Sequence, residues 1–408
     1  MDPRINPFAP GAGTQPPELA GRDQILENAS IALDRIKNRL SSKSLILVGL
    51  RGVGKTVLLN KIWEKADFNG FKAALIEANE EKSLPQLLIP HLRTILFSLD
   101  AMEFVSDKAK RGLRILGSFI KSIKAQIGDI ELGLGTEIGS ADSGDLEADL
   151  TELFVAVGEA AADRKTAVAI CVDELQYLSS EELGALIMAV HKINQRGLPL
   201  ILVGAGLPQV VGLSGKAKSY AERLFDYPDV GQLSDDDARK ALQTPVQHKG
   251  VRFDDDAITE VLARTQGYPY FLQQWGHEAW NIATESPITL DNIRAASGLA
   301  IKSLDQSFFR VRFDRLTPRE RQYLHALAKL GTGNQRSGDI AAELGVKPQS
   351  IAPIRSSLIK KGMIYSPEYG DTTFTVPLFG AFMLRIMQEP PDRQAIMRFE
   401  GELRHERS

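Results

Sequence analysis

Two patterns of hydrophobic and polar positions alternate along the first half of the chain. Short apolar runs, each as long as a buried strand, lie at residues 44–48, 73–78, 167–172 and 198–203. Segments with apolar positions at helical spacing lie around them, at residues 22–39, 55–66, 84–98, 146–162 and 180–194. Because strands that alternate with helices form parallel sheets covered by helices, this half of the chain predicts an α/β fold with a parallel sheet.

A long segment interrupts this alternation. Residues 107–126 form a basic amphipathic stretch, and residues 128–143 begin with alternating apolar positions and end in Gly, Ser and Asp. The second stretch is typical of either a solvated hairpin or a mobile loop. We therefore expect an insertion at residues 100–145 within the α/β region.

The strand pattern stops after Leu207. Ser234 precedes three aspartates at 235–237, which predicts a helix start, because serine caps a first turn and acidic groups favour its positive end. The pattern of residues 234–300 is then mostly helical. This part of the chain predicts a small helical lid, with expected bounds 233–305.

A third pattern begins after Leu316. Thr317, Pro318 and Glu320 form a capping box with proline at the first helical position. The pattern predicts helices at residues 318–330, 337–344 and 349–361, followed by strands at residues 363–366 and 372–376. Three helices followed by a β-hairpin predict a winged helix-turn-helix.

These patterns predict five parts in the chain. Residues 1–18 hold five prolines, which favours an extended arm over part of a core. The expected parts are an arm at 1–20, an α/β core at 21–232, the lid at 233–305, a winged-helix domain at 306–390 and a tail at 391–408.

Composition narrows the class of protein. The 408 residues include 49 Lys and Arg against 52 Asp and Glu, a net charge of −3 that excludes a uniformly basic nucleic-acid binder. Cys171 is the single cysteine, which excludes a disulfide scaffold and fits a reducing compartment. The sequence holds neither a signal-peptide pattern nor an apolar run long enough for a membrane span, so we expect a soluble cytoplasmic protein.

One motif points directly to a nucleotide. Residues 49–56 fit G-x-x-x-x-G-K-[ST], in which backbone N–H groups close around phosphates at the start of a helix. Lys55 is expected to reach the β- and γ-phosphates of ATP, and Thr56 to ligate Mg²⁺. A Gly-rich turn without a ligand is the alternative, but the flanking strand and helix favour the nucleotide site. The expected contacts in this segment are Gly49, Arg51, Gly52, Val53, Gly54, Lys55, Thr56 and Val57.

Two acids follow the buried strand at 167–172. Asp173 is expected to hold the Mg²⁺, and Glu174 to orient or deprotonate the attacking water. The alternative is that both acids cap the next helix. The strand at 198–203 runs into Gly204, Ala205 and Gly206, which offer no polar side chain to sense a γ-phosphate. Either Gln209 replaces that sensor or the sensor is absent, and we favour its absence.

Other candidate contacts lie outside these two motifs. Arg223 ends a short helical segment and is either an arginine finger toward a neighbouring subunit or an ordinary surface ion pair. Pro269 belongs to a Gly–Tyr–Pro turn that either contacts adenine or ribose or simply starts a lid helix. Gly21 and Arg22, just before the first helix, are candidates for the wall of the adenine pocket.

The C-terminal module has a charge of its own. Residues 310–361 hold eleven Lys and Arg against four Asp and Glu. Lys347, Gln349, Ser350 and Arg355 lie on or beside the expected recognition helix, and Tyr369 lies at the tip of the wing. These side chains could contact the phosphates and base edges of duplex DNA. Winged helices also serve as protein-interaction modules. Pro353 lies within the expected recognition helix, which makes this helix irregular for DNA recognition.

The combination of Gly21–Arg22, GLRGVGKT, VDELQYLS and a helical lid with GYP, followed by a winged helix, resembles the AAA+ ATPases. Within them the chain looks nearest to the origin-recognition ATPases and to related archaeal and STAND (signal-transducing) P-loop ATPases. It also resembles a bacterial family of ATP-binding proteins of about 400 residues that share the segments PPELAGR, DELQYL, GAGLP, KSYAERLF, GYPYFLQ and TVPLF. The resemblance implies phosphate and Mg²⁺ contacts by Lys55, Thr56, Asp173 and Glu174, with Arg223 as a finger.

Two departures from the AAA+ pattern affect the expected function. The sensor strand ends in Gly–Ala–Gly, and the lid has Pro269 where origin-recognition proteins present a sensor arginine.

The first hypothesis is an ATPase, active as a monomer or a homo-oligomer, that uses ATP to control DNA binding by the winged helix. The alternative is a slow STAND-type switch in which nucleotide locks the winged helix and its release recruits a protein partner.

Overall fold

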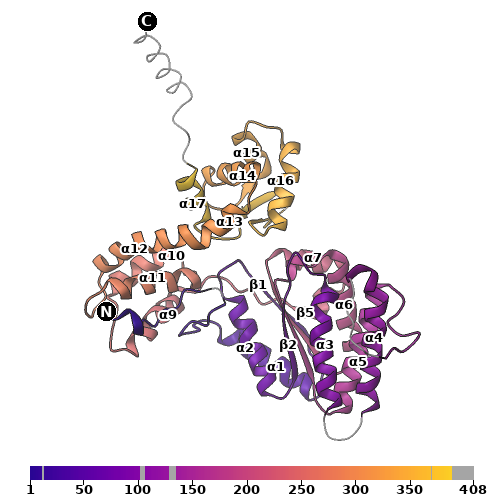
Figure 1. The fold of residues 1–408 in the computed structure, drawn as a ribbon. Coiled ribbons are helices and arrows are strands. Elements are labelled where there is room, and N and C mark those ends of the chain that lie inside the picture. The colour runs from indigo at the N-terminus through magenta and orange to yellow at the C-terminus, as the bar shows by residue number, and fades with distance from the viewer. Residues whose placement is uncertain (12, 102–105, 128–134, 369, 388–408) are drawn as a thin grey trace. The chain divides into compact units, whose positions relative to one another are not determined.

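The computed structural model describes residues 1–11, 13–101, 106–127, 135–368 and 370–387. The chain divides into two compact units, Met1–Ala300 and Ile301–Ser408. Figure 1 shows the helices and strands of each unit and labels most of the helices.

The first unit is built on a five-stranded sheet with the order β2-β3-β4-β1-β5, and every pairing in it is parallel. The strands are β1 (Ser44–Val48), β2 (Lys72–Glu77), β3 (Val168–Asp173), β4 (Leu200–Gly206) and β5 (Phe225–Asp226). The predicted parallel sheet is confirmed. Two strands differ from the prediction: β4 extends to Gly206, and β5 has only two residues, too few for a periodic pattern to show.

Helices cover both faces of this sheet (Figure 1). On one side lie α1 (Asp23–Lys37) and α2 (Lys55–Phe68), and on the other lie α3 (Leu84–Asp100), α5 (Leu146–Asp163) and α6 (Ser180–Gln195). The short elements between Asp173 and β5 are η2 (Leu175–Tyr177), α7 (Gln209–Ala217) and α8 (Ala221–Leu224). The strands of the central sheet are almost fully buried, which explains why they read as continuous apolar runs.

Helix α4 (Asp107–Ile127) adds a further layer outside the sheet and its helices. It packs against α3 and α5, and its apolar side chains Leu116 and Phe119 are fully buried there. The basic side chains lie on the opposite, wetter face, as the amphipathic pattern predicts. Of the expected hairpin or loop at 128–143, residues 128–134 lie outside the described residues, and residues 135–143 contain no strand.

The lid follows as α9 (Asp235–Gln247), α10 (Asp255–Thr265), α11 (Pro269–Ile282) and α12 (Leu290–Leu304). Its predicted helix start is confirmed, because Ser234 Oγ accepts a hydrogen bond of 3.2 Å from the backbone N–H of Asp237. The three aspartates occupy the first turn of α9, where the helix dipole favours negative charge.

The N-terminal segment does not behave as a separate extended arm. Phe8 is only 3% exposed, and its ring meets Phe253 edge-on. A Cβ on Gly276 of α11 would lie 2.7 Å from that ring, so this glycine makes the room that the ring occupies. The side chain of Asn6 also donates a hydrogen bond of 3.0 Å to His277 O. A single aromatic residue that fills such a gap leaves no periodic signal in the sequence.

The second unit begins within α12 and continues through a π-helical turn, η3 (Asp305–Phe309). It contains α13 (Arg310–Asp314), α14 (Pro318–Lys329), α15 (Ser337–Glu343), α16 (Pro348–Lys360) and α17 (Phe379–Ile386). Its antiparallel sheet has the order β6-β8-β7, with β6 (Gln335–Arg336), β7 (Ile364–Tyr365) and β8 (Asp371–Phe374). The predicted capping box is present, whereas β6 and α17 were not predicted.

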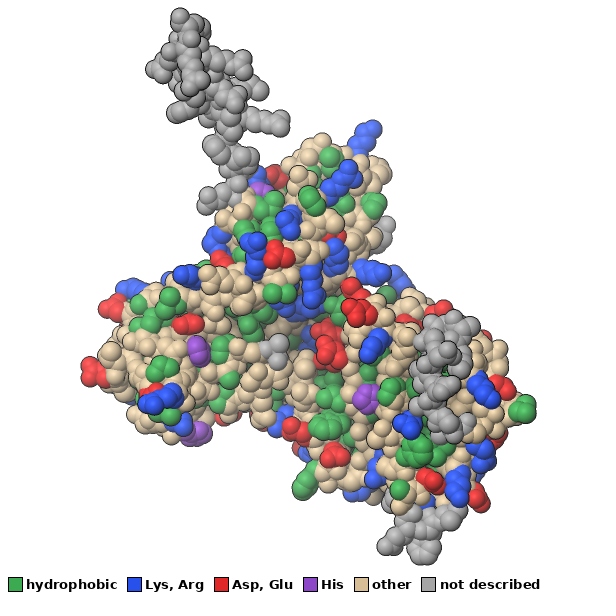
Figure 2. All heavy atoms as spheres, in the orientation of Figure 1, with side chains coloured by type: hydrophobic (Ala, Val, Ile, Leu, Met, Phe, Trp, Pro, Cys, Tyr) green, Lys and Arg blue, Asp and Glu red, His purple; other side chains and the backbone are tan. Residues whose placement is uncertain are grey.

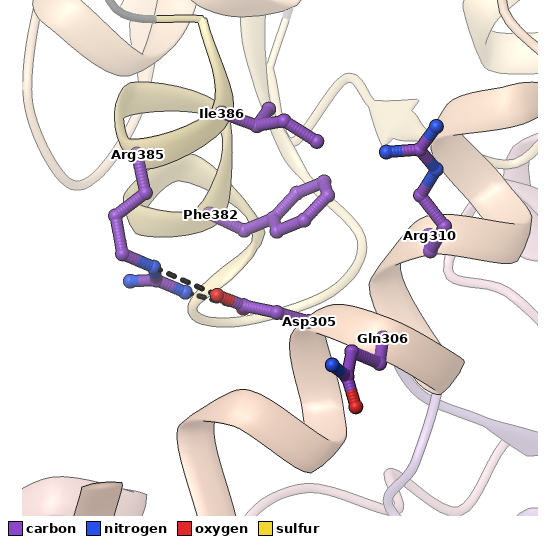
Figure 3. A pocket seen from close by; sticks show the side chains of 6 residues that line it. All are labelled: Asp305, Gln306, Arg310, Phe382, Arg385 and Ile386. Carbon is purple, nitrogen blue, oxygen red and sulfur yellow. Dashed lines mark hydrogen bonds and ion pairs between the residues drawn. The ribbon is translucent and has the colours of Figure 1, made fainter.

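Aromatic rings form the core of this unit, where Phe309, Phe379 and Phe382 meet with centroids 5.3–5.7 Å apart. Beside them is an open hollow of about 450 Å³. In Figure 3 the ion pair between Asp305 and Arg385, 2.6 Å long, joins η3 to α17 at the edge of this hollow. Phe382 and Ile386 point toward the side on which Arg310 lies. None of the residues that the motifs single out lines this hollow.

Candidate nucleotide site

The loop at 49–54 connects β1 to α2 and has the backbone that a phosphate cradle needs. Gly52 and Gly54 have φ of +84° and +95°, the left-handed region that glycine enters without steric cost. At Gly49 a Cβ would collide with the carbonyl oxygen of Val230. Glycine at these positions therefore lets the chain turn sharply and present its N–H groups ahead of a helix N-terminus. Val57, the third residue of α2, is buried in the core.

Lys55 is the most strongly perturbed cation of this region. Its side chain is buried, and Nζ donates a hydrogen bond of 2.8 Å to Leu50 O. Burial lowers the pKa of Lys55 to about 8, although the carboxylates of Glu174 and Asp173 oppose that shift. A buried ammonium with a lowered pKa gains from an additional negative charge, such as the phosphates that the motif predicts.

The loop and the end of β3 meet at Thr56. Its Oγ1 donates a hydrogen bond of 2.6 Å to Asp173 Oδ2, while Asp173 Oδ1 accepts 2.8 Å from the N–H of Glu174. Burial raises the pKa of Asp173, and its hydrogen bond from Thr56 offsets part of that shift. The described residues contain no cluster of three or more His, Cys, Asp or Glu side chains suited to a metal. One hydroxyl and one carboxylate fit Mg²⁺, which keeps waters and phosphate oxygens as its other ligands.

Arg51 connects the loop to the segment after β3. Its Nη2 donates a hydrogen bond of 2.8 Å to Tyr177 Oη, and its Nε is buried without a hydrogen-bond partner in the described structure. It also lies close enough to Lys55 to lower the pKa of that group. Neither Tyr177 nor the neighbouring Gln176 was predicted as a site residue. The only signal was that both carry polar atoms within the otherwise apolar segment that follows Glu174.

The side chain of Arg22 donates hydrogen bonds to backbone carbonyl oxygens of the loop and of the segment before α9. It is 7% exposed, and its Nη2 donates to Val53 O at 3.2 Å and also to Gly231 O. Burial lowers the pKa of Arg22, opposed by Asp237 and Asp229. Gly21 beside it has φ of +68°, and a Cβ there would lie 2.6 Å from Asp237 Oδ2. These side-chain contacts of the pair are with the loop, with the segment before α9 and with the first turn of α9.

The lid reaches the same loop through the turn before α11. Pro269 is the first residue of α11, and the N–H of the following Tyr270 donates a hydrogen bond of 3.2 Å to Gly52 O. Gly267 has φ of +70°, and a Cβ there would lie 2.5 Å from Leu233 O. The structure therefore brings Pro269 beside the phosphate loop, although the two are far apart in sequence.

Comparisons with known proteins agree with this geometry. Residues 18–203, which include the loop and the two acids, match a family model described as AAA ATPase domain. The parallel sheet and the glycine-rich loop after β1 agree with that match. The fold is that of an AAA+ P-loop ATPase. Residues 306–383 match a domain of unknown function (DUF8462), and a search of curated proteins found no match.

Three solved structures are similar to this chain over most of its length. The Walker-type ATPase PABY2304 of Pyrococcus abyssi is 17% identical, with a TM-score of 0.52 over 90% of this chain and 96% of that chain. The Aeropyrum pernix ORC1 protein, solved in complex with DNA, is 15% identical, with a TM-score of 0.47 over 91% and 94%. The Thermotoga maritima RuvB Holliday junction branch migration motor is 15% identical, with a TM-score of 0.44 over 87% and 92%. The fold assignment rests on the first.

The end of β4 carries no polar side chain, as its sequence predicts. A Cβ on Gly204 would collide with Leu175, and one on Gly206 would lie 2.6 Å from Val210 Cγ2. Gln209 Oε1 is buried and has no hydrogen-bond partner among the described residues. Arg223 is exposed on α8, and its guanidinium forms no ion pair with the described residues of its own chain.

The second unit carries the other predicted contacts. Lys347, Gln349 and Ser350 are exposed at the N-terminal end of α16. Figure 2 shows Lys and Arg side chains at several places on the surface of this unit. Tyr369 lies outside the described residues.

The structure places Arg355, a predicted DNA contact, against the hairpin of the second unit. Its Nε donates a hydrogen bond of 2.9 Å to Thr372 Oγ1, and its Nη2 donates to Ser366 Oγ at 2.8 Å and to Asp371 O at 2.7 Å. All three partners belong to the β7–β8 hairpin or its edges. Arg355 therefore fastens α16 to the hairpin, because these acceptors satisfy most of its donors.

None of the described helices has the length and apolar character needed to span a bilayer.

Proposed function

We propose that this protein is a Mg²⁺-dependent ATPase whose nucleotide state controls DNA binding by a winged-helix domain. The observation that carries the proposal is the hydrogen bond of 2.6 Å between Thr56 Oγ1 and Asp173 Oδ2. It joins the first turn of α2, directly after the phosphate loop, to the acids at the end of β3, and this pairing of a hydroxyl with a carboxylate supports a cation site beside the phosphates.

The residues present fit ATP with Mg²⁺, and each has a distinct task. Lys55, a buried ammonium, gains a favourable partner in the β- and γ-phosphates. Thr56 and Asp173 would hold the cation, and Glu174 would accept a proton from the attacking water. Mg²⁺ held there would supply positive charge to offset the charge that develops on the phosphate oxygens during transfer. Arg223, exposed and free of ion pairs with the described residues of its own chain, acts on the site of a neighbouring subunit in a homo-oligomer.

The second unit supports the DNA-binding half of the proposal. Helices α14, α15 and α16 are followed by the β7–β8 hairpin, and β6 completes a three-stranded sheet, an arrangement that fits a winged helix-turn-helix. The exposed side chains of Lys347, Gln349 and Ser350 at the start of α16 would meet phosphates and base edges. The local excess of basic residues in 310–361 favours the same partner.

Steady-state ATP hydrolysis with and without duplex DNA, at two salt concentrations, tests both halves. We expect turnover that requires Mg²⁺, is strongly reduced but measurable in Glu174→Gln, and rises with DNA at low salt but less so at moderate salt. Lys347→Glu should weaken DNA binding and leave ATP affinity unchanged. Lys121→Glu, the same charge change at an exposed lysine on α4, is its matched control. Turnover of Glu174→Gln equal to that of wild type would refute the proposed base.

The end of β4 favours a second candidate function. Gly204, Ala205 and Gly206 supply no polar group to read the γ-phosphate, a departure that suits slow hydrolysis. In this alternative, the protein is a STAND-type switch that nucleotide locks and that acts on a protein partner. Very slow turnover that is indifferent to DNA, together with wild-type behaviour of Lys347→Glu, would select this alternative over the first.

A further inference from the structure

Gln176 occupies a buried position between the predicted catalytic acid and the end of β4. It lies in η2, two residues after Glu174, and is 9% exposed. Its Oε1 accepts a hydrogen bond of 3.0 Å from the N–H of Leu207, the residue directly after β4, and this bond is buried. Its Nε2 donates to a carboxylate oxygen of Glu174. One side chain therefore bridges the acid and the end of the strand.

The two hydrogen bonds determine the orientation of the amide. A backbone N–H can only donate, so the amide atom that faces Leu207 must be the carbonyl oxygen. The amide nitrogen then faces Glu174, and an ionised carboxylate can only accept. A flipped amide would place an oxygen against the carboxylate and a nitrogen against the N–H, and it would lose both bonds. Gln176 thus restrains the carboxylate of Glu174 in one direction.

The glycines of β4 make room for this arrangement. A Cβ on Gly204 would collide with Leu175, and a Cβ on Gly206 would lie 3.1 Å from Gln176 Oε1. A side chain on β4 therefore cannot occupy the space that η2 fills. The polar group at this end of the strand comes from Gln176 instead of from β4 itself.

We propose that Gln176 is the positioning residue for Glu174 and couples the direction of its carboxylate to the backbone at the end of β4. The inference rests on the proposed role of Glu174 in ATP hydrolysis. Within the described part of the chain, the side chain of Gln176 forms hydrogen bonds with Glu174 and Leu207 and none with Lys55, Thr56 or Asp173, so its loss should affect turnover and leave nucleotide binding unchanged. A displaced general base reduces catalysis strongly, because proton transfer depends on its geometry.

Two variants of the full-length protein test the inference. Gln176→Leu removes both bonds at similar side-chain volume. Gln176→Glu keeps an acceptor for Leu207 N–H but cannot donate to ionised Glu174. We expect kcat to fall about tenfold to a hundredfold in both, with the dissociation constant of ATP within about twofold of wild type. The matched control is Gln195→Leu, at an exposed glutamine of α6, which should keep wild-type kcat.

A double-mutant cycle separates positioning from a structural role. If Gln176 acts through Glu174, then Gln176→Leu should cause no further loss of kcat in a Glu174→Gln background. Single-turnover hydrolysis and thermal unfolding are measured on every variant. If Gln176→Leu does not fold, Gln176→Glu carries the test, because its bond to Leu207 remains.

The outcomes distinguish this inference from the proposed function. Wild-type turnover in Glu174→Gln would refute the catalytic role of Glu174 and the inference with it. Loss of turnover in Glu174→Gln, with kcat unchanged or raised in Gln176→Glu, would overturn the role of Gln176 alone. A parallel loss of ATP affinity in both Gln176 variants would also overturn it, because positioning of the base does not alter nucleotide binding.

Discussion

Thr56 Oγ1 donates a hydrogen bond of 2.6 Å to Asp173 Oδ2 across a separation of 117 residues. Thr56 is the second residue of α2, and Asp173 is the last residue of β3, two strands away from β1 in the sheet. The bond therefore exists only when the parallel order of the strands is correct. It joins the two motifs that sequence analysis could identify only separately.

Loss of the hydroxyl at Thr56 should remove the Mg²⁺-dependent part of ATP binding. Thr56→Val keeps the shape of the side chain but supplies no ligand for the cation. We expect ATP affinity in Mg²⁺ to fall about tenfold or more, the range seen when groups that hold a metal are disturbed, with little change in EDTA. Isothermal titration calorimetry measures both. The exposed Thr259→Val on α10 is the matched control, and equal loss in Mg²⁺ and EDTA would contradict the assignment.

Lys55 should destabilise the folded protein in the absence of nucleotide. Its pKa, lowered from 10.5 to about 8 by burial, means that between these values the unfolded chain binds a proton that the folded chain does not. The free energy of unfolding therefore rises with pH across this window. Below pH 8, the destabilisation that comes from burying the protonated lysine is fully present. Lys55→Met should gain at most roughly 3 kcal/mol at pH 7, less the loss of the bond to Leu50 O.

Urea denaturation of wild type and Lys55→Met at pH 7 and pH 10 measures this effect. The difference in the free energy of unfolding should shrink at the higher pH, because the wild-type lysine is then neutral in the folded state. A difference that is equal at both values would contradict the origin of the effect in burial. Lys55→Met should also fail to bind ATP at either pH.

Phe8 should stabilise the lid from the N-terminal segment. Phe8→Ala removes a buried ring that packs against Gly276 and Phe253, so we expect a loss of about 3–5 kcal/mol in the free energy of unfolding. Phe68→Ala is the matched control, because Phe68 is 91% exposed, and it should change stability by less than about 0.5 kcal/mol. Equal effects of the two substitutions would show that Phe8 is not docked in solution.

Substitution of Arg355 should reduce folding stability, whereas substitution of Lys347 should weaken DNA binding. Arg355→Ala removes three hydrogen bonds between α16 and the hairpin, so we expect a loss of about 1–3 kcal/mol in stability. Lys347→Ala should leave stability unchanged, weaken duplex binding and reduce the salt slope of the affinity by about one. Thermal unfolding and fluorescence anisotropy against salt separate the two roles. Normal duplex binding by Lys347→Ala would contradict the proposed DNA contact.

Most of the helices and strands could be predicted because their signals are local. The buried strands around Ile46 and Ile170 are continuous apolar runs, and the capping box at Thr317 and Glu320 is complete within four residues. The predictions failed where the signal was too short or not periodic. Strand β5 has two residues, and Phe8 is a single aromatic residue that fills a gap on a helix far along the chain.

The residues of the candidate site also divide into those with a local sequence signal and those without one. Lys55, Thr56, Asp173 and Glu174 could be predicted as candidates from spacing alone, because a phosphate loop and a strand that ends in acids are both contiguous in sequence. The partners of Arg22 and Arg355 were not predictable. Both side chains donate to backbone or side-chain oxygens that are distant in sequence, and composition cannot distinguish a free cation from a satisfied one.

The sequence by itself therefore determined the parallel α/β class, the phosphate loop and the two acids, because hydrophobic period and glycine spacing act over a few residues. Only the tertiary structure decided that the Thr56 hydroxyl meets Asp173, that Arg355 binds the hairpin, and that Gln176 bridges Glu174 and the end of β4. Those contacts depend on strand order and on side-chain direction, and both arise only when the whole sheet packs.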